Sequence, residues 1–223
     1  MSIDTTLLLL SVAAYLIGSL SFAVIVSRFM GLDDPRTYGS QNPGATNVLR
    51  SGNKKAAALT LLFDALKGYF PVLLTKWYGP AWGLDDQAVA LVAFAAFIGH
   101  VWPVFFRFQG GKGVATAAGV LFGVEPLLGL ATLLTWLTVA FVFRYSSLAA
   151  LSASVLSPAI YLLCGQMGEH VLWQTSGPEL LAVAAMSALL LLRHKDNILR
   201  LAAGQESKIG AKKETPPAEG DVA

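Results

Sequence analysis

The sequence has 223 residues, of which 55% are hydrophobic and only 13% are charged, and its mean hydropathy is +0.59. A soluble domain of this length needs far less apolar surface, so most of the chain is expected to lie in lipid. The net charge is +2 and no basic stripe is present, which excludes a nucleic-acid-binding function. The single cysteine, Cys164, cannot form an intrachain disulfide, so the fold needs no oxidising compartment.

The N-terminal apolar run extends from Thr6 to Met30. No basic region precedes it, and it is longer than the core of about 7 to 15 residues that is typical of a signal peptide. We therefore interpret it as a retained membrane helix.

Seven apolar stretches follow one another along the chain, each bounded by a turn or a charge cluster. Most approach the ~20 residues that are needed to cross a bilayer. The fourth stretch is the exception, because a helix of its length would be only about 16 Å long. The pattern predicts an all-α polytopic membrane protein with a bundle of seven transmembrane helices, over Thr6 to Met30, Lys55 to Tyr78, Gln87 to Phe106, Val114 to Val124, Pro126 to Phe143, Ser147 to Gly165 and Pro178 to Arg193.

The distribution of charge distinguishes seven spans from six. Merging Val114 to Val124 with its neighbour would give six spans and would place Arg193, Lys195 and Arg200 on the same side as the acidic loops. With seven spans these residues lie on a single basic face, and the opposite loops are acidic. By the positive-inside rule, the N-terminus is then periplasmic and the C-terminus cytoplasmic. The basic face carries Arg28, Arg36, Arg50, Lys54, Lys55, Arg107, Lys112, Arg144, Arg193, Lys195, Arg200, Lys208, Lys212 and Lys213, and the opposite face carries Asp4, Asp85, Asp86, Glu125, Glu169 and Glu179.

The C-terminal segment has a different composition. Residues 207–223 are rich in Lys, Glu, Pro and Ala and have no apolar period, which predicts a disordered cytoplasmic tail. Residues 1–206 are expected to form a single transmembrane domain, and no internal repeat is apparent.

The first polar segment, from Asp33 to Arg50, contains more turn formers and hydrogen-bonding groups than a plain connector between two helices would need. Its glycines permit close backbone approach, and Arg50 adds a guanidinium suited to phosphate. A capped loop that starts the next helix is the alternative interpretation, and Asp33 and Asp34 are typical solvated turn residues. The segment also supplies four hydrogen-bonding side chains, Ser40, Asn42, Thr46 and Asn47.

The second polar segment is Gln109-Gly110-Gly111-Lys112-Gly113, which leads directly into the short fourth stretch. Backbone N–H groups of a glycine-rich turn at a helix N-terminus, together with one lysine, are suited to binding an anion. The spacing of a Walker A loop is absent, because Phe106 stands where its first glycine should be. A flexible turn at the membrane edge with a snorkelling lysine is the alternative.

The third polar segment, Arg193 to Glu206, leaves the last span at the basic face. If it stays helical, His194, Asn197 and Arg200 share one side and can face a common site. Positive-inside anchoring is the alternative, and it explains Lys195 better than it explains His194 or Asn197.

Two helices of the predicted bundle carry ionisable residues far from their ends. Asp64 and Lys67 are three residues apart, and such a pair either supports the bundle or borders a site. His100 precedes the GGKG turn by about two helical turns and is expected to be a buried hydrogen-bonding group. Pro103 is expected to kink that helix. His170 lies on the opposite face and receives no role.

Metal and serine-nucleophile chemistry find no support in the sequence. No cluster of His, Cys or carboxylates has ligand spacing, so no metal or other cofactor is expected. No GxSxG elbow is present, and no base lies beside Ser40 in the sequence.

Together and in this order, GSQNPGATN with Arg50, HVWPVFFRFQGGKG and RHKDNILRLAAGQE resemble the bacterial acyl-phosphate:glycerol-3-phosphate acyltransferase family, PlsY. The likeness extends from the Gly18-Ser19 pair to Glu206. It implies a seven-helix bundle in the bacterial inner membrane with its active site at the cytoplasmic surface. It further implies transfer of a fatty acyl group from acyl phosphate to the sn-1 hydroxyl of glycerol 3-phosphate, without cofactors, and a soluble partner enzyme that makes the acyl phosphate.

The resemblance also assigns residues by motif position. His194, Lys112 and Arg50 would be catalytic. Direct attack by the hydroxyl is expected, and either His194 or the phosphate of the substrate takes the proton; the sequence leaves both open. The substrate-binding set would be Ser40, Asn42, Gly44, Ala45, Thr46, Asn47, Gly110, Gly111, Gly113, Asn197, Arg200 and Glu206.

Two rival functions predict other patterns. An organic-phosphate transporter would show a repeat and polar residues in both halves of the membrane, whereas the polar residues here gather at one face. A phosphatidyl-group transferase of the CDP-alcohol type would need a cluster of helix-borne aspartates for a divalent metal, which Asp64 alone does not supply.

Overall fold

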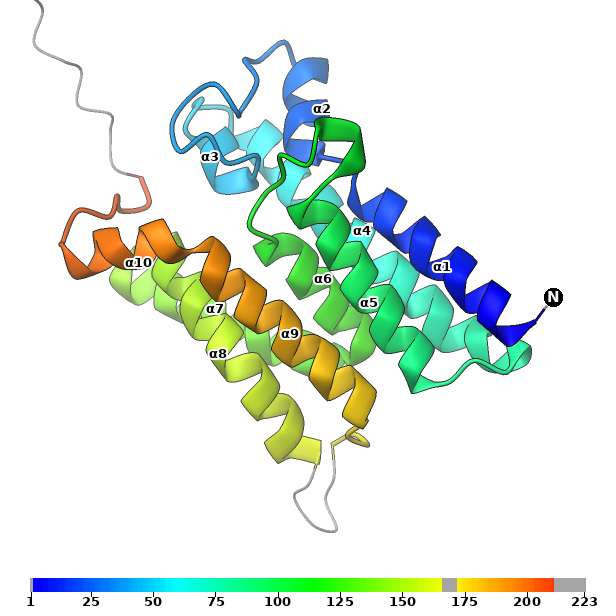
Figure 1. The fold of residues 1–223 in the computed structure, drawn as a ribbon. Coiled ribbons are helices and arrows are strands. Elements are labelled where there is room, and N and C mark those ends of the chain that lie inside the picture. Colours follow the sequence, from blue (N-terminus) through cyan, green and yellow to red (C-terminus); the bar gives the residue numbers. More distant parts are fainter. Residues whose placement is uncertain (1, 166–171, 211–223) are drawn as a thin grey trace, which may run out of the picture.

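The computed structural model describes residues 2–165 and 172–210. This part of the chain is all-helical, as expected from the sequence, and contains no strand (Figure 1). Its helices are α1 (Ile3–Gly18), α2 (Phe22–Phe29), α3 (Ala45–Leu49), α4 (Lys54–Tyr78), α5 (Asp86–Val101), α6 (Val114–Val124), α7 (Pro126–Phe143), α8 (Ser146–Gly165), α9 (Gly177–Arg193) and α10 (Lys195–Ala202), with 3-10 turns η1 (Gly79–Trp82) and η2 (Val104–Phe106).

Several of these helices are long and apolar enough to cross a membrane. Within the described ranges there are four, Lys54–Trp82, Asp86–Phe106, Pro126–Phe143 and Ser146–Gly165. The number rises to six if α1 with α2 and α9 with α10, each a bent pair, are counted as single spans. Helix α6 is apolar but has only 11 residues. The structure is therefore that of a multi-helix membrane protein, and the count of seven spans and the orientation stay predictions.

The first apolar stretch is not the single helix expected over Thr6 to Met30. It breaks between Gly18 and Phe22, and α1 and α2 are bent by 45°. A long-range contact holds the break, because Lys67 Nζ of α4 donates a hydrogen bond of 2.6 Å to the Leu20 carbonyl. That carbonyl faces a charged side chain instead of continuing the helical ladder. The break turns α2, and the loop that follows it, over the end of the bundle.

Pro103 does not kink a continuing helix, contrary to expectation. Helix α5 ends at Val101, and Trp102 at its C-cap leaves helical geometry with φ −130° and ψ 73°. A residue before proline is disfavoured in the α region, so the helix stops ahead of the proline instead of bending at it. The chain then forms η2 and leads into the GGKG turn.

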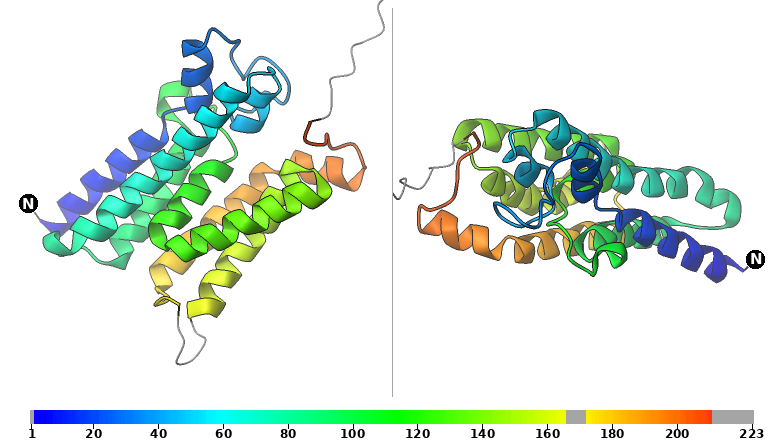
Figure 2. Two further views of the ribbon diagram at one scale, coloured as in Figure 1. Left: turned by 180° about the vertical axis from the view of Figure 1, so that it is seen from behind. Right: turned by 90° about the horizontal axis from the view of Figure 1, so that it is seen from above.

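The remaining predicted boundaries agree closely with the structure. Helices α6 and α7 begin and end where the sequence predicts, and α4, α8 and α9 each begin one residue earlier. The main apolar core lies among α5, α6, α7 and α9 and includes Phe97, Val120, Leu128 and Val183. The α2–α4 loop, the GGKG turn and α10 all lie at one end of the bundle, and the N-terminus lies at the other (Figures 1 and 2).

Helix α6 is held by unusually close packing against α4. A Cβ atom on Gly119 would lie only 1.9 Å from the Ala65 carbonyl oxygen, so the two backbones touch where the glycine has no side chain. Close backbone approach at small residues is a main source of helix association in membranes. This contact fixes the short helix, and with it the turn that precedes it.

Substitution of this glycine tests the contact. Gly119→Ala should lower the stability of the protein in detergent by roughly 1–3 kcal/mol, because the added methyl group cannot fit against α4. Gly177→Ala is the matched control, since a Cβ there meets nothing within 4 Å. Thermal unfolding of both variants measures the difference, and equal midpoints would contradict the packing described here.

Candidate active site

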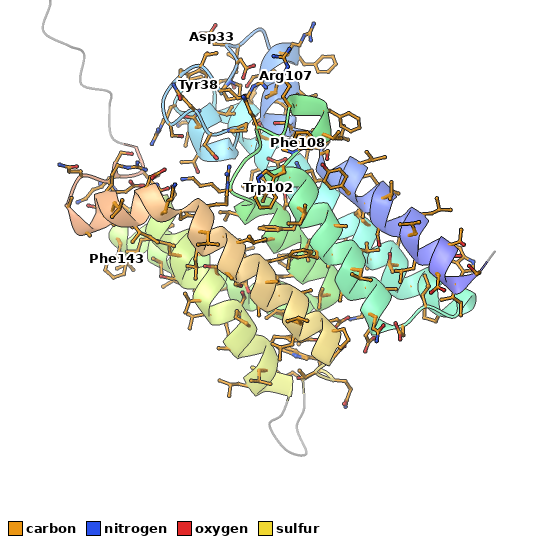
Figure 3. The ribbon with its side chains drawn as sticks, viewed as in Figure 1. Asp33, Tyr38, Trp102, Arg107, Phe108 and Phe143 are labelled. Atoms are coloured by element: carbon orange, nitrogen blue, oxygen red, sulfur yellow. The ribbon has the colours of Figure 1, made fainter. Side chains whose placement is uncertain are left out.

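The three polar segments meet at one end of the bundle. In Figure 3, Tyr38 of the first segment lies at the same end as Trp102 and Phe108, which precede the GGKG turn. A Cβ on Gly111 would lie 3.0 Å from the Pro43 carbonyl oxygen, so the first and second segments touch. The convergence expected from the sequence is therefore present in the structure.

Asn47 organises the first segment. Its side-chain amide donates hydrogen bonds to the carbonyls of Pro35 (2.6 Å) and Tyr38 (3.2 Å), and its side-chain oxygen accepts one from the Ser40 N–H (3.0 Å). The residue is only 2% exposed. All of its side-chain groups are occupied within the loop, so its side chain shapes the loop and is not available to a ligand.

The outer part of the first segment is accessible. Ser40, Thr46 and Arg50 are exposed, and Asn42 is half-buried. The Arg50 guanidinium donates a hydrogen bond of 2.9 Å to the Ser207 hydroxyl, which joins the first segment to the residues after α10. These side chains form the rim of the convergence zone.

Glycine is required in the GGKG turn by its neighbours. A Cβ on Gly111 would lie 2.2 Å from His100 Nε2, and one on Gly113 would lie 2.2 Å from the Phe97 ring. Gly113 also has φ +92°, a conformation that side chains disfavour. The Gly111 N–H donates to the His100 carbonyl (3.2 Å). The turn therefore packs closely against the C-terminal end of α5.

Arg193, at the end of α9, also binds the GGKG turn. Its guanidinium donates hydrogen bonds to the carbonyls of Gly110 (3.2 Å) and Gly111 (3.3 Å). Arg193 was expected on the basic face and at the start of the third segment, but this contact with the turn was not predicted. Its position beside His194 in the third segment was the available signal, but basic residues at a membrane edge have a simpler explanation.

A chain of hydrogen bonds joins the second and third segments. Lys112 Nζ donates to the Asn197 side-chain oxygen, and the Asn197 amide donates to Glu206 (2.6 Å). Glu206 also accepts hydrogen bonds from Arg200 Nε (2.7 Å) and from the Ser147 hydroxyl (2.7 Å). Four of these residues were expected from the sequence; Ser147 was not, because it lies at the start of an apolar helix.

The charges along this series of hydrogen bonds favour the binding of an anion. Burial lowers the pKa of Lys112 to about 8, with Arg200 and Arg193 acting in the same direction and Glu206 opposing them. Burial alone would raise the pKa of Glu206, but hydrogen bonds from Ser147, Asn197 and Arg200 hold it below its usual value. The Glu206 carboxylate therefore holds the donor groups of Ser147, Asn197 and Arg200 in place. The Lys112 ammonium, by contrast, forms no salt bridge with a carboxylate in the described part of the chain.

His194 is held in a defined orientation at the junction of α9 and α10. It is only 3% exposed, and its Nδ1 lies 2.8 Å from the Leu190 carbonyl, which can only accept a hydrogen bond. Nδ1 therefore carries the proton, and Nε2 is left as an acceptor in the neutral ring. Burial lowers the pKa of His194 to about 4, so the ring is neutral at physiological pH.

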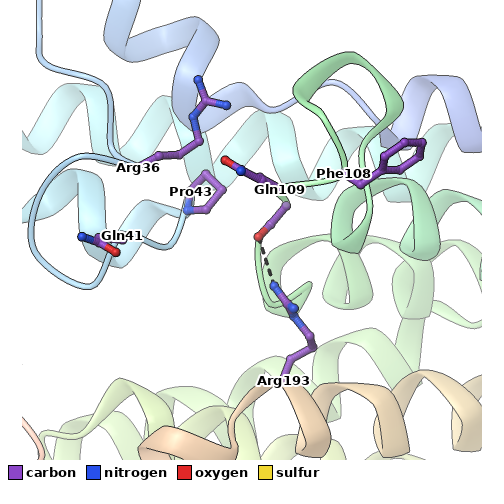
Figure 4. A pocket seen from close by; sticks show the side chains of 7 residues that line it. Arg36, Gln41, Pro43, Phe108, Gln109 and Arg193 are labelled. Atoms are coloured by element: carbon purple, nitrogen blue, oxygen red, sulfur yellow. Dashed lines mark hydrogen bonds between the residues drawn. The ribbon is translucent and has the colours of Figure 1, made fainter.

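A cavity of about 420 Å³ opens between the first segment, the GGKG turn and α9. This volume is sufficient for a small polar ligand. Figure 4 shows the Arg193 side chain reaching from α9 toward the turn, opposite Arg36 and Gln41 of the first segment. The lining is polar at this end of the bundle, and its residues are Arg36, Gln41, Pro43, Phe108, Gln109, Gly110 and Arg193.

Other residues considered from the sequence lie elsewhere. Asp64, Lys67 and His100 are buried behind the GGKG turn, and Cys164 is half-buried near the end of α8. Residues 2–165 and 172–210 contain no group of three or more His, Cys, Asp or Glu that could hold a metal ion. His170 and residues 211–223 of the expected tail lie outside the described residues. Residues 207–210 of the expected tail are described, and there Ile209 exchanges hydrogen bonds with Arg144.

Comparison with known proteins gives consistent matches over most of the chain. The profile of the family described as glycerol-3-phosphate acyltransferase matches residues 8–204. A glycerol-3-phosphate acyltransferase of Paraburkholderia phytofirmans is 60% identical over 213 residues, which are 95% of this chain and 94% of that protein. One from Burkholderia pseudomallei is 62% identical over 210 residues, 94% of this chain and 98% of that protein.

Two solved structures also match most of the chain. The crystal structure of PlsY (YgiH), described as an integral membrane glycerol 3-phosphate acyltransferase, superimposes in its glycerol 3-phosphate form with a TM-score of 0.82 and 36% identity. Its lysophosphatidic acid form gives a TM-score of 0.80 and the same identity. Each match covers 92% of this chain and 96% of the solved chain.

Proposed function

This chain belongs to the glycerol-3-phosphate acyltransferase family, and we propose that its active site is the place where the three polar segments converge. The enzyme transfers a fatty acyl group from acyl phosphate to the sn-1 hydroxyl of glycerol 3-phosphate, giving lysophosphatidic acid and phosphate. The observation that carries the location is the contact of Lys112 with Asn197 beside a turn that touches Pro43. One anion-binding surface is thereby built from three distant parts of the sequence.

The reaction brings together two anionic substrates, one of which carries an acyl chain that lies in lipid. A basic surface at the end of a membrane bundle offsets the repulsion between the two phosphates, and binding orients the hydroxyl near the carbonyl carbon. The hydroxyl oxygen forms a bond to that carbon, and the bond from the carbon to the phosphate oxygen breaks. Phosphate is a good leaving group, so an enzyme nucleophile is not required.

The charged and amide side chains supply the binding groups. Lys112 would exchange its contact with Asn197 for a substrate phosphate, and Asn197 would stay in place through its bond to Glu206. Arg50 and Arg200 add positive charge at the rim. Together with the loop backbones, the proposed substrate-binding set is Ser40, Asn42, Gly44, Ala45, Thr46, Asn47, Gly110, Gly111, Gly113, Asn197, Arg200 and Glu206; Asn47 contributes by shaping the loop.

The proton of the attacking hydroxyl has two possible acceptors, His194 and a substrate phosphate. His194 Nε2 can accept a hydrogen bond, which suits it to orient the hydroxyl. Burial lowers the pKa of His194 to about 4, whereas the second pKa of a phosphate group is about 6. The phosphate is the stronger base, so we assign it the proton and assign His194 the orientation of the hydroxyl.

We propose an orientation of the bundle from its charges. The three polar segments lie at one end of the bundle, and the start of α5 and the junction of α6 with α7, where Asp85, Asp86 and Glu125 stand in the sequence, lie at the other (Figure 1). We assign the basic end to the cytoplasm, with seven spans if α6 is counted, a periplasmic N-terminus and a location in the bacterial inner membrane. A soluble enzyme that produces acyl phosphate would then deliver its product from the cytoplasmic side.

A donor comparison tests the proposed function. The purified full-length protein in detergent should form lysophosphatidic acid from glycerol 3-phosphate and acyl phosphate, with or without a chelator. Acyl-CoA and acyl-ACP should give no product, because a thioester carries sulfur and not a phosphate on its carbonyl carbon, so no phosphate leaving group reaches the basic surface beside that carbon. Product from a thioester, or from none of the three donors, would contradict the assignment.

The pKa of Lys112 predicts a pH dependence for substrate binding. Because burial lowers this pKa to about 8, the ammonium is lost as the pH rises through 8 and its fraction falls about tenfold per unit above that. The KM for glycerol 3-phosphate should therefore rise between pH 8 and pH 9.5, while Lys112→Arg should keep a flat KM over this range. A flat KM for the unaltered enzyme would show that the Lys112 charge does not bind this substrate.

A further inference from the structure

A buried charged cluster lies behind the GGKG turn, and acyl transfer as described above makes no use of it. Asp64 and Lys67 of α4 are 2% and 4% exposed, and His100 of α5 is 6% exposed. Lys67 Nζ lies 2.7 Å from Asp64 Oδ1, and His100 Nδ1 lies 3.7 Å from the same oxygen. Charged groups at such depth are costly and mark functional positions more often than structural ones.

Through Lys67, the cluster binds the break that precedes α2, the helix that leads into the first segment. Lys67 Nζ donates its hydrogen bond to the Leu20 carbonyl, in the break between α1 and α2. Helix α2 leads directly into the loop that carries Ser40 and Arg50. The position of that loop therefore depends on where Lys67 holds the break.

The other side of the cluster supports the second segment. The His100 ring lies directly behind the turn, because a Cβ on Gly111 would be 2.2 Å from Nε2 and 2.9 Å from Cε1. The His100 carbonyl also accepts the Gly111 N–H. The Tyr15 hydroxyl donates to the Trp102 carbonyl (2.8 Å), which joins α1 to the same stretch of chain.

We infer that Asp64, Lys67 and His100 form a positioning network that sets the spacing between the first segment and the GGKG turn. None of the three is a catalytic residue, since each lies behind the turn and not on its open side. Asp64 joins the two contacts, because its carboxylate lies between the ammonium that holds Leu20 and the ring that supports Gly111. The inference rests on the proposed function, in which those two segments bind phosphate groups.

The physical reason for such a network is the precision that the reaction requires. A misplacement of about 1 Å in a binding group can cost on the order of 100-fold in rate. Loops at a membrane surface are mobile unless they are tied to a rigid element. Rigid helices α4 and α5 supply the anchor, and the buried charges transmit their position to both loops.

Neutralising the central carboxylate is the first test. Asp64→Asn should raise the KM for glycerol 3-phosphate on the order of tenfold or more, because the two loops lose their common anchor. The matched control is Glu179→Gln, which makes the same chemical change at an equally buried carboxylate, 4% exposed, in the polar cluster at the opposite end of the bundle. Both variants should lose thermal stability, but only Asp64→Asn should change KM.

A double-mutant cycle tests the contact with the turn and does not depend on the stability of the Asp64 variant. Gly111→Ala should lose activity because its methyl group meets the His100 ring, and His100→Ala should raise KM because the support is gone. Combined, the two changes should restore activity at least fivefold relative to Gly111→Ala, since the methyl group fills the vacated space and its remaining tight contact, the Pro43 carbonyl oxygen at 3.0 Å, needs a shift of only a few tenths of an ångström.

Gly110→Ala is the control for this cycle. Its Cβ would meet the backbone carbonyls of His100 (2.2 Å) and Val101 (2.4 Å), which His100→Ala does not remove. Adding His100→Ala to Gly110→Ala should therefore restore nothing.

The outcomes separate this inference from the proposed function. If the unaltered enzyme forms no lysophosphatidic acid from acyl phosphate, the proposed function fails. If it does, but Asp64→Asn matches Glu179→Gln in KM or the His100 and Gly111 changes act independently, the positioning network is overturned. A selective change in KM together with rescue in the cycle supports it.

Discussion

The candidate site depends on one steric constraint, the absence of side chains at the GGKG turn. The Gly111 backbone lies against the His100 ring and close to the Pro43 carbonyl, with no space for a methyl group toward His100. This close approach lets Lys112 reach Asn197 and lets Arg193 bind the carbonyls of the turn. Three segments that are distant in sequence thereby form a single anion-binding surface.

Membrane burial explains why this surface can be strongly polar. Helices α4 and α6 pack backbone to backbone, so their stability comes from close contact of small residues and not from groups at the end of the bundle. Polar residues are then free to gather at that end, where the headgroup region supplies water and counterions. The long acyl chain of one substrate and the phosphate of the other meet at such a boundary.

The sequence predicted the elements that local signals define. Glu125-Pro126 separates α6 from α7, and the glycines before Val114 set the start of α6, so these boundaries agree with the structure. The break after Gly18 was missed because the contact that holds it, the bond from Lys67 to the Leu20 carbonyl, joins residues 47 positions apart. Arg193 was missed for a similar reason, since its bonds to the turn cross 82 and 83 positions. Motif composition identified which residues matter, but not which of them bind their own loop, as Asn47 does.

The central claim is that the three segments share one side of the membrane, the cytoplasmic side. The most direct measurement is labelling of single cysteines at exposed positions, Thr46→Cys, Gln109→Cys and Lys195→Cys, in a Cys164→Ala background with a membrane-impermeant maleimide. In intact cells only the control at the opposite end, Asp85→Cys, should react, and the other three should react after the membrane is opened. Reaction of any of the three from outside would contradict a shared cytoplasmic site.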